Sequence, residues 1–380
     1  MSSALVLCAA DPAADPRPNR MIRCLARDFV VHVLARGQVA VPGVFCQRIP
    51  ALPYRTILHR AANALRLYRG HYRHMVWTPG LRPLATAHRQ LDHAVIVVHD
   101  LRLLPVALAI RRRGRVLFDA REYYPRHYED VWWWRLLYQQ FNRDLCRRYL
   151  PRVDHLVTVS AGLADEYSRE FGVACAVLPS MPTPVACDPR PVDPAHIRLV
   201  HHGLASRSRR IERMIEMTDH LPERFTLDLI LMASDARYLA SLRALCATRP
   251  RVRILPAVPF KDLVSVTNQY DIGVFLVPPV SFNLRFALPN KFFEFVQARL
   301  MVAIGPSPEM AHLVKEHDLG VVADDFAPAT LAAALSRLSV EEIMRFKQHA
   351  HRAAAVLNSE RTDATVRSII LNQEPPPGAT

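Results

Sequence analysis

Short runs of apolar residues alternate along this chain with longer stretches in which apolar side chains recur at helical spacing. Most of these runs are continuously apolar, which is typical of strands buried on both faces of a sheet. Because helical stretches separate them, the strands are expected to pair in parallel within β–α–β units. We expect strands at 4–8, 29–34, 94–99, 115–118 and 155–159, and again at 197–202, 226–232, 252–255, 271–277, 301–304 and 320–322.

A proline-rich segment separates the two series of strands. Residues 177–196 contain six prolines, as expected of a connection between domains. We therefore predict an α/β fold with two doubly wound, Rossmann-like domains that face each other across a cleft. The expected parts are an N-terminal domain at 1–183, a linker at 184–196, a C-terminal domain at 197–345, a helical segment at 346–372 that could return to the N-terminal domain, and a disordered tail at 373–380.

Composition indicates the compartment in which the protein works, but it does not identify the binding partner. The apolar runs are too short to span a bilayer and no basic stretch precedes the first one, so we expect a cytoplasmic protein. Seven cysteines without any C-x-x-C pair argue against a disulfide framework or a zinc knuckle. A net charge of +14 favours phosphate-bearing partners, which include nucleic acid, anionic membranes and diphosphate substrates.

The segment ALPNKFFEFVQARL, residues 287–300, predicts a helix that begins after Pro289, with Asn290 as its N-cap. Lys291 and Glu294 are three residues apart and so lie on one face of this helix. Lys291 and the helix N-terminus suit a diphosphate, and a carboxylate about 5 Å further along suits ribose hydroxyls. The alternative is an amphipathic helix with a surface ion pair.

The segment LVHHGLASRSRRIERMIEM, residues 199–217, predicts a strand ending at Gly203, a basic loop and a helix. Gly203 would let the backbone approach a ligand closely, and Arg207, Arg209 and Arg210 would present guanidinium groups to phosphate oxygens. A solvated basic loop is the alternative. The chain has only 12 glycines, so phosphate binding must depend on basic side chains more than on a glycine cradle.

Two polar clusters follow strands of the first half, where a parallel sheet opens onto its ligand site. The first cluster is His99 and Asp100, for which a helix cap beside a packed histidine is the alternative. The second is Asp119, Arg121 and Glu122. The carboxylates could orient an acceptor hydroxyl, and Arg121, which stays protonated, could stabilise a leaving diphosphate or bind an anionic sugar.

Together these segments resemble those of retaining, family-4-like glycosyltransferases with the GT-B fold (glycosyl transferases group 1). The matching residues are Gly203, Arg210, Pro289, Asn290, Lys291 and Glu294. The resemblance extends over nearly the whole chain, including DPAADPRPNRMIRCLARDF near the start and LVTVSAGLADEYSREFGV before the proline-rich segment. It implies a nucleotide-sugar-binding C-terminal domain, an acceptor-binding N-terminal domain, and retention at the anomeric carbon. The implied acceptor is a saccharide or a lipid-linked saccharide in bacterial surface polysaccharide or glycolipid assembly.

Two positions depart from the family pattern. Phe286 stands where the first glutamate of a Glu-x7-Glu pair would contact the donor sugar, and Arg121 replaces a histidine. The chain has no Asp-x-Asp, so we expect neither a metal nor another cofactor, with Lys291 and Arg210 neutralising the diphosphate instead. The alternatives are a nucleotide-sugar epimerase of the same fold, an inactive relative, and a basic nucleic-acid-binding protein, for which we find no recognition motif.

Two stretches, residues 56–77 and 131–150, are both basic and aromatic. Trp132, Trp133 and Trp134, followed by arginines, suit a helix at a membrane surface. We therefore expect the protein to lie peripherally on the inner face of the cell membrane or, if these tryptophans pack in the core, to stay in the cytoplasm.

Overall fold

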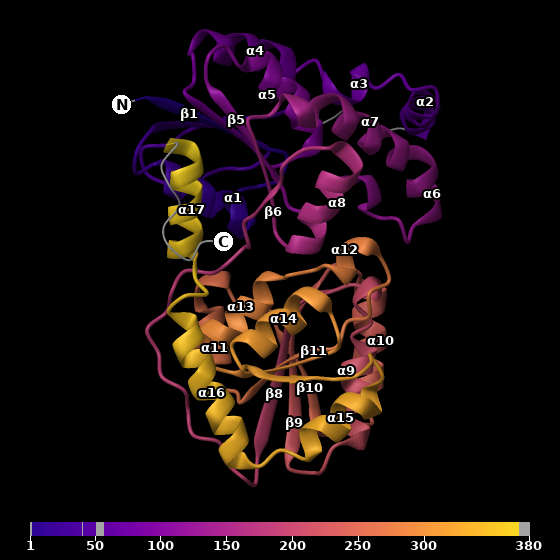
Figure 1. Cartoon of the computed structure of the whole chain (residues 1–380). Coiled ribbons are helices and arrows are strands. Elements are labelled where there is room, and N and C mark those ends of the chain that lie inside the picture. The colour runs from indigo at the N-terminus through magenta and orange to yellow at the C-terminus, as the bar shows by residue number, and fades with distance from the viewer. Residues whose placement is uncertain (1, 40, 51–56, 372–380) are drawn as a thin grey trace. The chain divides into compact units, whose positions relative to one another are not determined.

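The computed structural model describes residues 2–39, 41–50 and 57–371. They belong to two compact units, each built on one parallel sheet. The N-terminal unit comprises residues 1–179, 281–283 and 362–380, and the C-terminal unit comprises residues 180–280 and 284–361. Two Rossmann-like α/β units, predicted from the alternation of strands and helices, are thereby confirmed (Figure 1).

The described strands of the N-terminal unit form a seven-stranded sheet in the order β3-β2-β1-β4-β5-β6-β7, with every neighbouring pair parallel. The strands are β1 (Ser3–Cys8), β2 (Val30–Ala35), β3 (Phe45–Arg48), β4 (Val95–Val98), β5 (Arg115–Ala120), β6 (His155–Thr158) and β7 (Ala176–Val177). The helices are α1 (Pro16–Leu25), α2 (Ile57–Tyr68), α3 (Arg73–Val76), α4 (Leu81–Gln90), α5 (Leu104–Ile110), α6 (Trp132–Trp134), α7 (Gln140–Tyr149), α8 (Ala161–Phe171) and most of α17 (Ser359–Leu371).

Helices α1 and α17 cover one face of this first sheet. Alternate residues of β1 and β2 share a hydrophobic cluster with Met21 and Ile22 of α1 and with Val366 and Ile370 of α17. Side chains on a strand alternate between its faces, so this cluster lies on a single face of the sheet. The end of the described chain thus packs into the core of the unit that contains its beginning (Figure 1).

The described strands of the C-terminal unit form a six-stranded parallel sheet in the order β10-β9-β8-β11-β12-β13. The strands are β8 (Ile197–Ala205), β9 (Phe225–Ala233), β10 (Val252–Pro256), β11 (Ile272–Phe275), β12 (Met301–Ile304) and β13 (Gly320–Val322). The helices are α9 (Glu212–Met217), α10 (Ala236–Cys246), α11 (Leu263–Thr267), α13 (Asn290–Gln297), α14 (Pro308–Glu316), α15 (Pro328–Ser336) and α16 (Val340–Ala354), while α12 (Phe282–Arg285) is divided between the units.

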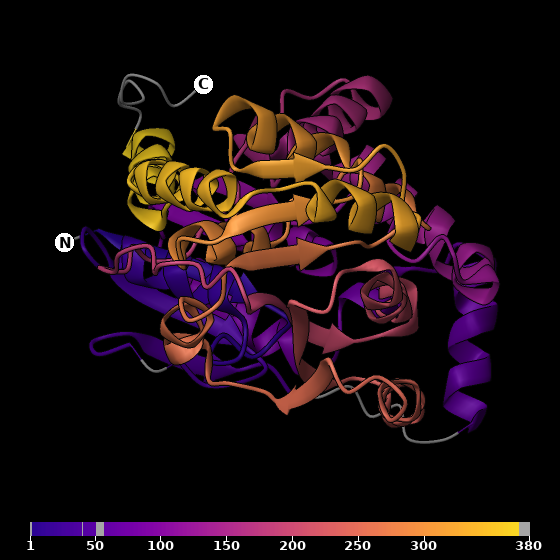
Figure 2. The ribbon, with the colours of Figure 1, turned by 90° about the horizontal axis from the view of Figure 1, so that it is seen from below.

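Two hydrophobic clusters lie on opposite faces of the second sheet. Leu199 and Val274 belong to the cluster that includes residues of α9, α10 and α15, whereas the adjacent Val200 and Phe275 belong to the cluster that includes α11, α13, α14 and α16. Helices therefore cover both faces of this sheet, as Figure 2 shows, which explains why its strands are apolar throughout.

The structure differs from the sequence prediction mainly at the edges of the first sheet and around residue 180. Strands β3 and β7 were not predicted; both are short and every residue in them is exposed. Residues 184–196, expected to be a linker, lie with the C-terminal unit, where Val185 N–H donates to Gln297 Oε1 at 3.2 Å and Val192 is buried in the core.

The predicted C-terminal helical segment consists of two helices with different partners. Helix α16 packs against the second sheet, whereas α17 packs into the first. The tail predicted at 373–380 lies outside the described residues. Within the described part of the chain, none of the helices combines the length and the hydropathy needed to cross a bilayer.

Candidate functional site

In the C-terminal unit the sheet opens between β8 and β11. These strands pair directly only at Leu199–Ile272 and Val200–Gly273. One residue further along β8, the buried His201 side chain lies between the strands, with its Nδ1 2.8 Å from the Val274 carbonyl oxygen. This is the point at which the strand order reverses, where open α/β sheets bind their ligands.

Gly203, on β8 just beyond this opening, is where two basic side chains meet. Its φ of +132° is one that residues with a side chain rarely adopt. A Cβ placed on Gly203 would lie 2.9 Å from Lys291 Nζ and 3.0 Å from Arg209 Nη1. An ammonium group and a guanidinium group therefore sit directly against bare backbone, in the space that a side chain would otherwise fill.

Lys291 is buried, and a histidine fixes its position. Because His201 Nδ1 donates its hydrogen to the Val274 carbonyl, its Nε2 is left to accept one from Lys291 Nζ, 3.1 Å away. Burial and the nearby charge of Arg209 hold the pKa of Lys291 well below its ordinary value, and Glu294 opposes them. Burial and the neighbouring positive charge thus disfavour the protonated form of Lys291, and an anion bound beside it would favour that form.

Glu294 lies one turn further along α13 and is also buried. Its Oε2 is 3.4 Å from Nε2 of His202, the neighbour of His201 on β8. Phe292, Phe293 and Val296 are fully packed in the core, as the helical pattern predicted. The N-cap differs from the prediction, because Pro289 occupies that position in extended conformation and Asn290 is the first helical residue.

Arg207 and Arg210, predicted to bind phosphate, point to acidic residues at the surface instead. Arg207 Nε is 3.2 Å from Asp235, and Arg210 Nη1 is 3.6 Å from Glu212. Their side chains are 66% and 57% exposed. Arg210 adopts a left-handed conformation, with φ of +47°, which ends the turn formed by residues 207–209. Strand β8 also runs two residues beyond the predicted end at Gly203.

In the N-terminal unit, two of the predicted catalytic residues are enclosed in the core. Asp119 at the end of β5 is fully buried and accepts hydrogen bonds from Arg17 Nε at 2.7 Å and Nη2 at 2.6 Å. His99, also fully buried, places Nδ1 3.0 Å from Asp119 Oδ2. Burial alone would raise the pKa of Asp119, but Arg17 and His99 together hold it below its ordinary value. This carboxylate orients Arg17 and is not accessible to a substrate.

The other three predicted residues remain partly exposed. Arg121 forms an ion pair with Asp15, the N-cap of α1, and its Nη2 lies 4.0 Å from Asp100 Oδ1. Asp100 Oδ2 accepts a hydrogen bond of 2.6 Å from Ala9 N–H, which joins the ends of β4 and β1. Glu122 is 45% exposed, with Oε2 2.6 Å from His127 Nε2. The cluster lies at the carboxyl ends of central strands, where the first sheet reverses its strand order.

Sequence reasoning missed Arg17 and His201, and it treated Arg209 as one of three similar arginines. Arg17 is separated from Asp119 by 102 positions, so no local pattern joins them. His201 precedes Lys291 by 90 positions. Their shared signal is that each lies at the carboxyl end of a predicted strand or in the helix that follows one.

Known structures share this architecture along the whole chain. HepE from Anabaena, solved with UDP and glucose, aligns with a TM-score of 0.72 at 12% identity over 98% of this chain and 100% of its own. Sucrose-phosphate synthase from Thermosynechococcus elongatus gives 0.74 at 15% identity, over 97% and 98%. WaaG, a glycosyltransferase involved in lipopolysaccharide biosynthesis, gives 0.64 at 12% identity, over 96% and 99%.

No protein-family model matches the sequence, and no curated protein matches it significantly. The likeness is therefore one of structure, at low identity. The two parallel sheets with their helices align with these structures over nearly the whole length of each chain. The chain has the GT-B fold.

Proposed function

We propose that this chain is a glycosyltransferase that takes its sugar from a nucleoside-diphosphate donor bound by the C-terminal unit. The observation that carries the proposal is the convergence of Lys291 Nζ and Arg209 Nη1 on the bare backbone of Gly203. Two cations beside an accessible peptide suit a diphosphate, which needs both neutralisation and close approach. HepE, similar in fold, was solved with UDP and with UDP-glucose.

The rest of the site suits the nucleoside. Glu294 lies on the same helix as Lys291 and could accept hydrogen bonds from ribose hydroxyls, as its position one turn away suggested. Phe286 stands where a glutamate is expected, so this position has no carboxylate to accept hydrogen bonds from the donor sugar. The donor sugar is then held by contacts other than a charged hydrogen bond at this position.

Binding of UDP, measured by isothermal titration calorimetry, tests this proposal. We expect Lys291→Ala and Arg209→Ala each to weaken binding by about tenfold or more, because each removes a charge-assisted hydrogen bond. Arg210→Ala is the matched control, since its side chain is 57% exposed and paired with Glu212. Unchanged affinity in the Lys291 variant, or equal losses in all three, would contradict the proposed site.

For the reaction we propose transfer with retention and without a divalent cation. Lys291 and Arg209 stabilise the charge of the departing diphosphate, and a phosphate oxygen accepts the proton of the attacking hydroxyl on the same face of the sugar. Transfer should continue in excess EDTA. The anomeric configuration of the product, read by NMR, should match that of the donor, and an inverted product would exclude this mechanism.

The acceptor, we propose, is bound by the N-terminal unit and is a saccharide of bacterial surface polysaccharide or glycolipid assembly. Arg121, Asp100 and Glu122 are the partly exposed polar groups at the opening of the first sheet. Carboxylates there can hold sugar hydroxyls, and Arg121 can hold an acidic substituent. Arg121→Ala should reduce transfer while UDP affinity stays unchanged.

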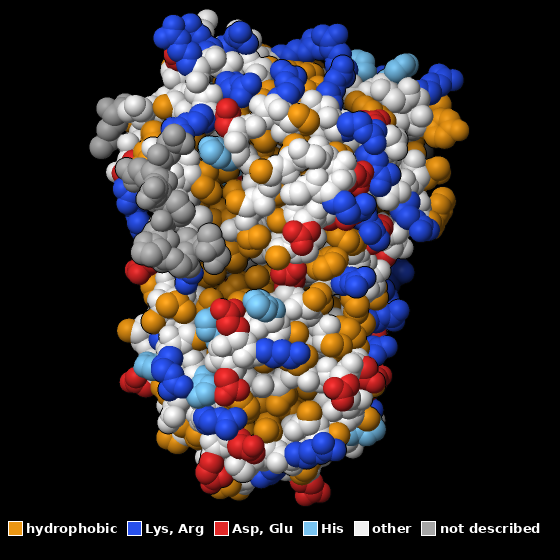
Figure 3. Space-filling view, viewed as in Figure 1, with side chains coloured by type: hydrophobic (Ala, Val, Ile, Leu, Met, Phe, Trp, Pro, Cys, Tyr) orange, Lys and Arg blue, Asp and Glu red, His pale blue; other side chains and the backbone are white. Residues whose placement is uncertain are grey.

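We also propose that the N-terminal unit contacts a membrane surface through α2 and α6. Trp134 is buried, but Trp132, Trp133 and Leu136 are 68%, 48% and 59% exposed, and Tyr68 on α2 is 73% exposed. Helix α2 packs against residues 135–139, which follow α6, so these exposed side chains lie on neighbouring segments. Figure 3 shows hydrophobic side chains among basic ones there. Flotation with anionic vesicles should carry the protein at low salt, and Trp132→Ser/Trp133→Ser should reduce it.

A further inference from the structure

We propose that an arginine-lined hollow in the N-terminal unit binds an acidic oligosaccharide. The hollow lies among α3, α4 and α7, away from the cluster of Arg121 and Asp100. This inference rests on the proposed transferase function, because it assigns the hollow to the acceptor or to the growing product. It specifies the chemical class of that glycan, which the fold leaves open.

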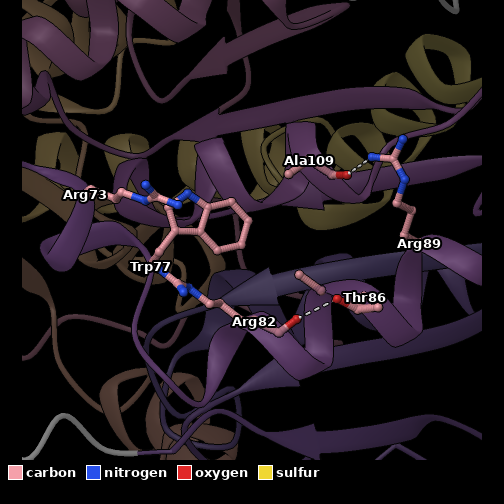
Figure 4. Close-up of a pocket in the computed structure, with 7 residues that line it drawn as sticks. Arg73, Trp77, Arg82, Thr86, Arg89 and Ala109 are labelled. Carbon is pink, nitrogen blue, oxygen red and sulfur yellow. Dashed lines mark hydrogen bonds between the residues drawn. The ribbon is translucent and has the colours of Figure 1, made fainter.

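The hollow consists of two adjoining parts with volumes of about 860 and 360 Å³. Arg73 of α3 and the adjacent Trp77 line both parts, so the two lie next to each other. Volumes of this size are usual for sites that hold a small molecule or a short segment of a polymer, about 300–1,000 Å³. Figure 4 shows Arg73, Trp77 and Arg82 close together in the smaller part, with Arg89 on the far side.

Arginines dominate the lining. Those in the larger part are Arg66, Arg73, Arg148 and Arg152, and the smaller part adds Arg82 and Arg89. Arg89 Nη1 donates to the Ala109 carbonyl at 2.6 Å, which fixes one wall. Figure 3 shows basic side chains gathered over the end of this unit that carries α3 and α4.

These positive charges have little compensation from the protein itself. Asp144 is the one carboxylate among the described lining residues, and its oxygens accept hydrogen bonds from Tyr72 and Gln140. Among the described residues, no carboxylate oxygen lies within 4.0 Å of Arg66, Arg73, Arg82, Arg148 or Arg152. Guanidinium groups crowded without counter-charges repel one another, and a multivalent anion would relieve that repulsion.

The shape and the aromatic residues favour an acidic glycan over other polyanions. A bilayer surface cannot enter a hollow, and the exposed apolar side chains that suit a membrane lie on α2 and α6. Single-stranded nucleic acid needs successive aromatic faces for its bases. Here the ring of Tyr72 packs on Phe141 at 4.9 Å, and that of Tyr149 faces Arg152 at 5.7 Å.

A sugar chain does not need such a row of aromatic side chains. Trp77, half-buried where the two parts join, can pack against the apolar face of one sugar ring. Planar guanidinium forks match the carboxylate of a uronic acid, or a phosphate or sulfate substituent, with paired hydrogen bonds. Repeated acidic groups along the glycan would then engage arginines in both parts of the hollow.

Titration calorimetry with trigalacturonic acid at low salt tests the assignment. The variant Arg73→Glu/Arg148→Glu reverses two charges of the larger part and should bind at least about tenfold more weakly than the unmodified protein. The matched control, Arg243→Glu/Arg337→Glu, makes the same change in net charge on exposed residues of the C-terminal unit and should bind normally. Neutral maltotriose should show no comparable affinity.

Equal affinity of the Arg73/Arg148 variant and the control would overturn the proposal. So would tighter binding of a short single-stranded RNA, or of anionic vesicles, that shows the same dependence on Arg73 and Arg148. UDP binding, measured in parallel, distinguishes a failure of the proposed donor site from a failure of the proposed glycan site. Lost trigalacturonate binding with intact UDP binding supports the hollow, whereas an unmodified protein that binds trigalacturonate but no UDP contradicts the donor site alone.

Discussion

Replacing Gly203 by alanine is the sharpest test of the donor site, because the added methyl group should abolish most nucleotide binding while the protein still folds. The new Cβ would lie 2.9 Å from Lys291 Nζ and 3.0 Å from Arg209 Nη1, closer than van der Waals contact allows. Both neighbours are the ends of flexible side chains, so the fold can adapt by moving them. The diphosphate site cannot adapt in this way, because Lys291 Nζ and Arg209 Nη1 are the groups that the phosphate oxygens would contact.

The size of both effects follows from the geometry. At φ of +132° an alanine is strained, which should lower the free energy of unfolding by about 1–3 kcal/mol. For the nucleotide, displacement of two charged donors and loss of the backbone approach should cost about 3 kcal/mol or more. At about 1.4 kcal/mol per tenfold, that is a loss of UDP affinity of roughly a hundredfold.

Two measurements and one matched variant separate these effects. Urea denaturation gives the change in free energy of unfolding, and titration calorimetry gives UDP affinity. Gly172→Ala is the control, because Gly172 also has a positive φ, of +65°, and no atom lies within 4 Å of a Cβ placed there. It should be destabilised by backbone strain alone and bind UDP normally. If Gly203→Ala binds UDP as tightly as Gly172→Ala does, no diphosphate lies against this backbone.

Three further outcomes are expected from the described contacts. UDP affinity should fall as pH rises, by up to tenfold per pH unit, because Lys291, whose pKa is depressed, takes up a proton when the anion binds. Lys291→Met should flatten this pH dependence. An affinity that does not change with pH in the unmodified protein would contradict the reasoning. Arg17→Met should lower the free energy of unfolding by about 3–5 kcal/mol, since it leaves the buried Asp119 carboxylate without its arginine and with only His99 beside it. Adding Asp119→Leu should recover most of that stability in urea denaturation. Gln297→Leu should lower the free energy of unfolding by about 1–3 kcal/mol in the same assay, because Val185 N–H and the Leu357 carbonyl lose their hydrogen bonds to Gln297, while the Ala354 carbonyl keeps the one from Asn358 Nδ2.

Much of the fold could be predicted because parallel strands covered on both faces must be apolar at nearly every position. All eleven predicted strands are present, with ends shifted by a few residues at most. Strands β3 and β7 escaped prediction because they lie at the sheet edges with exposed residues, where neither alternation nor an apolar run marks them. Proline content likewise misplaced the boundary, since residues 184–196 gain hydrogen bonds and burial from the C-terminal unit.

The sequence by itself determined the features that depend on spacing within one element. Lys291 and Glu294 share a face of α13 because a helix brings residues three apart together, whatever surrounds it. Tertiary structure alone decided which arginine joins Lys291: the left-handed backbone at Arg210 turns that side chain toward Glu212, and Arg209 meets Lys291 at Gly203. It also enclosed Asp119 with Arg17, because contacts between residues 102 positions apart arise only when strands and helices pack into layers.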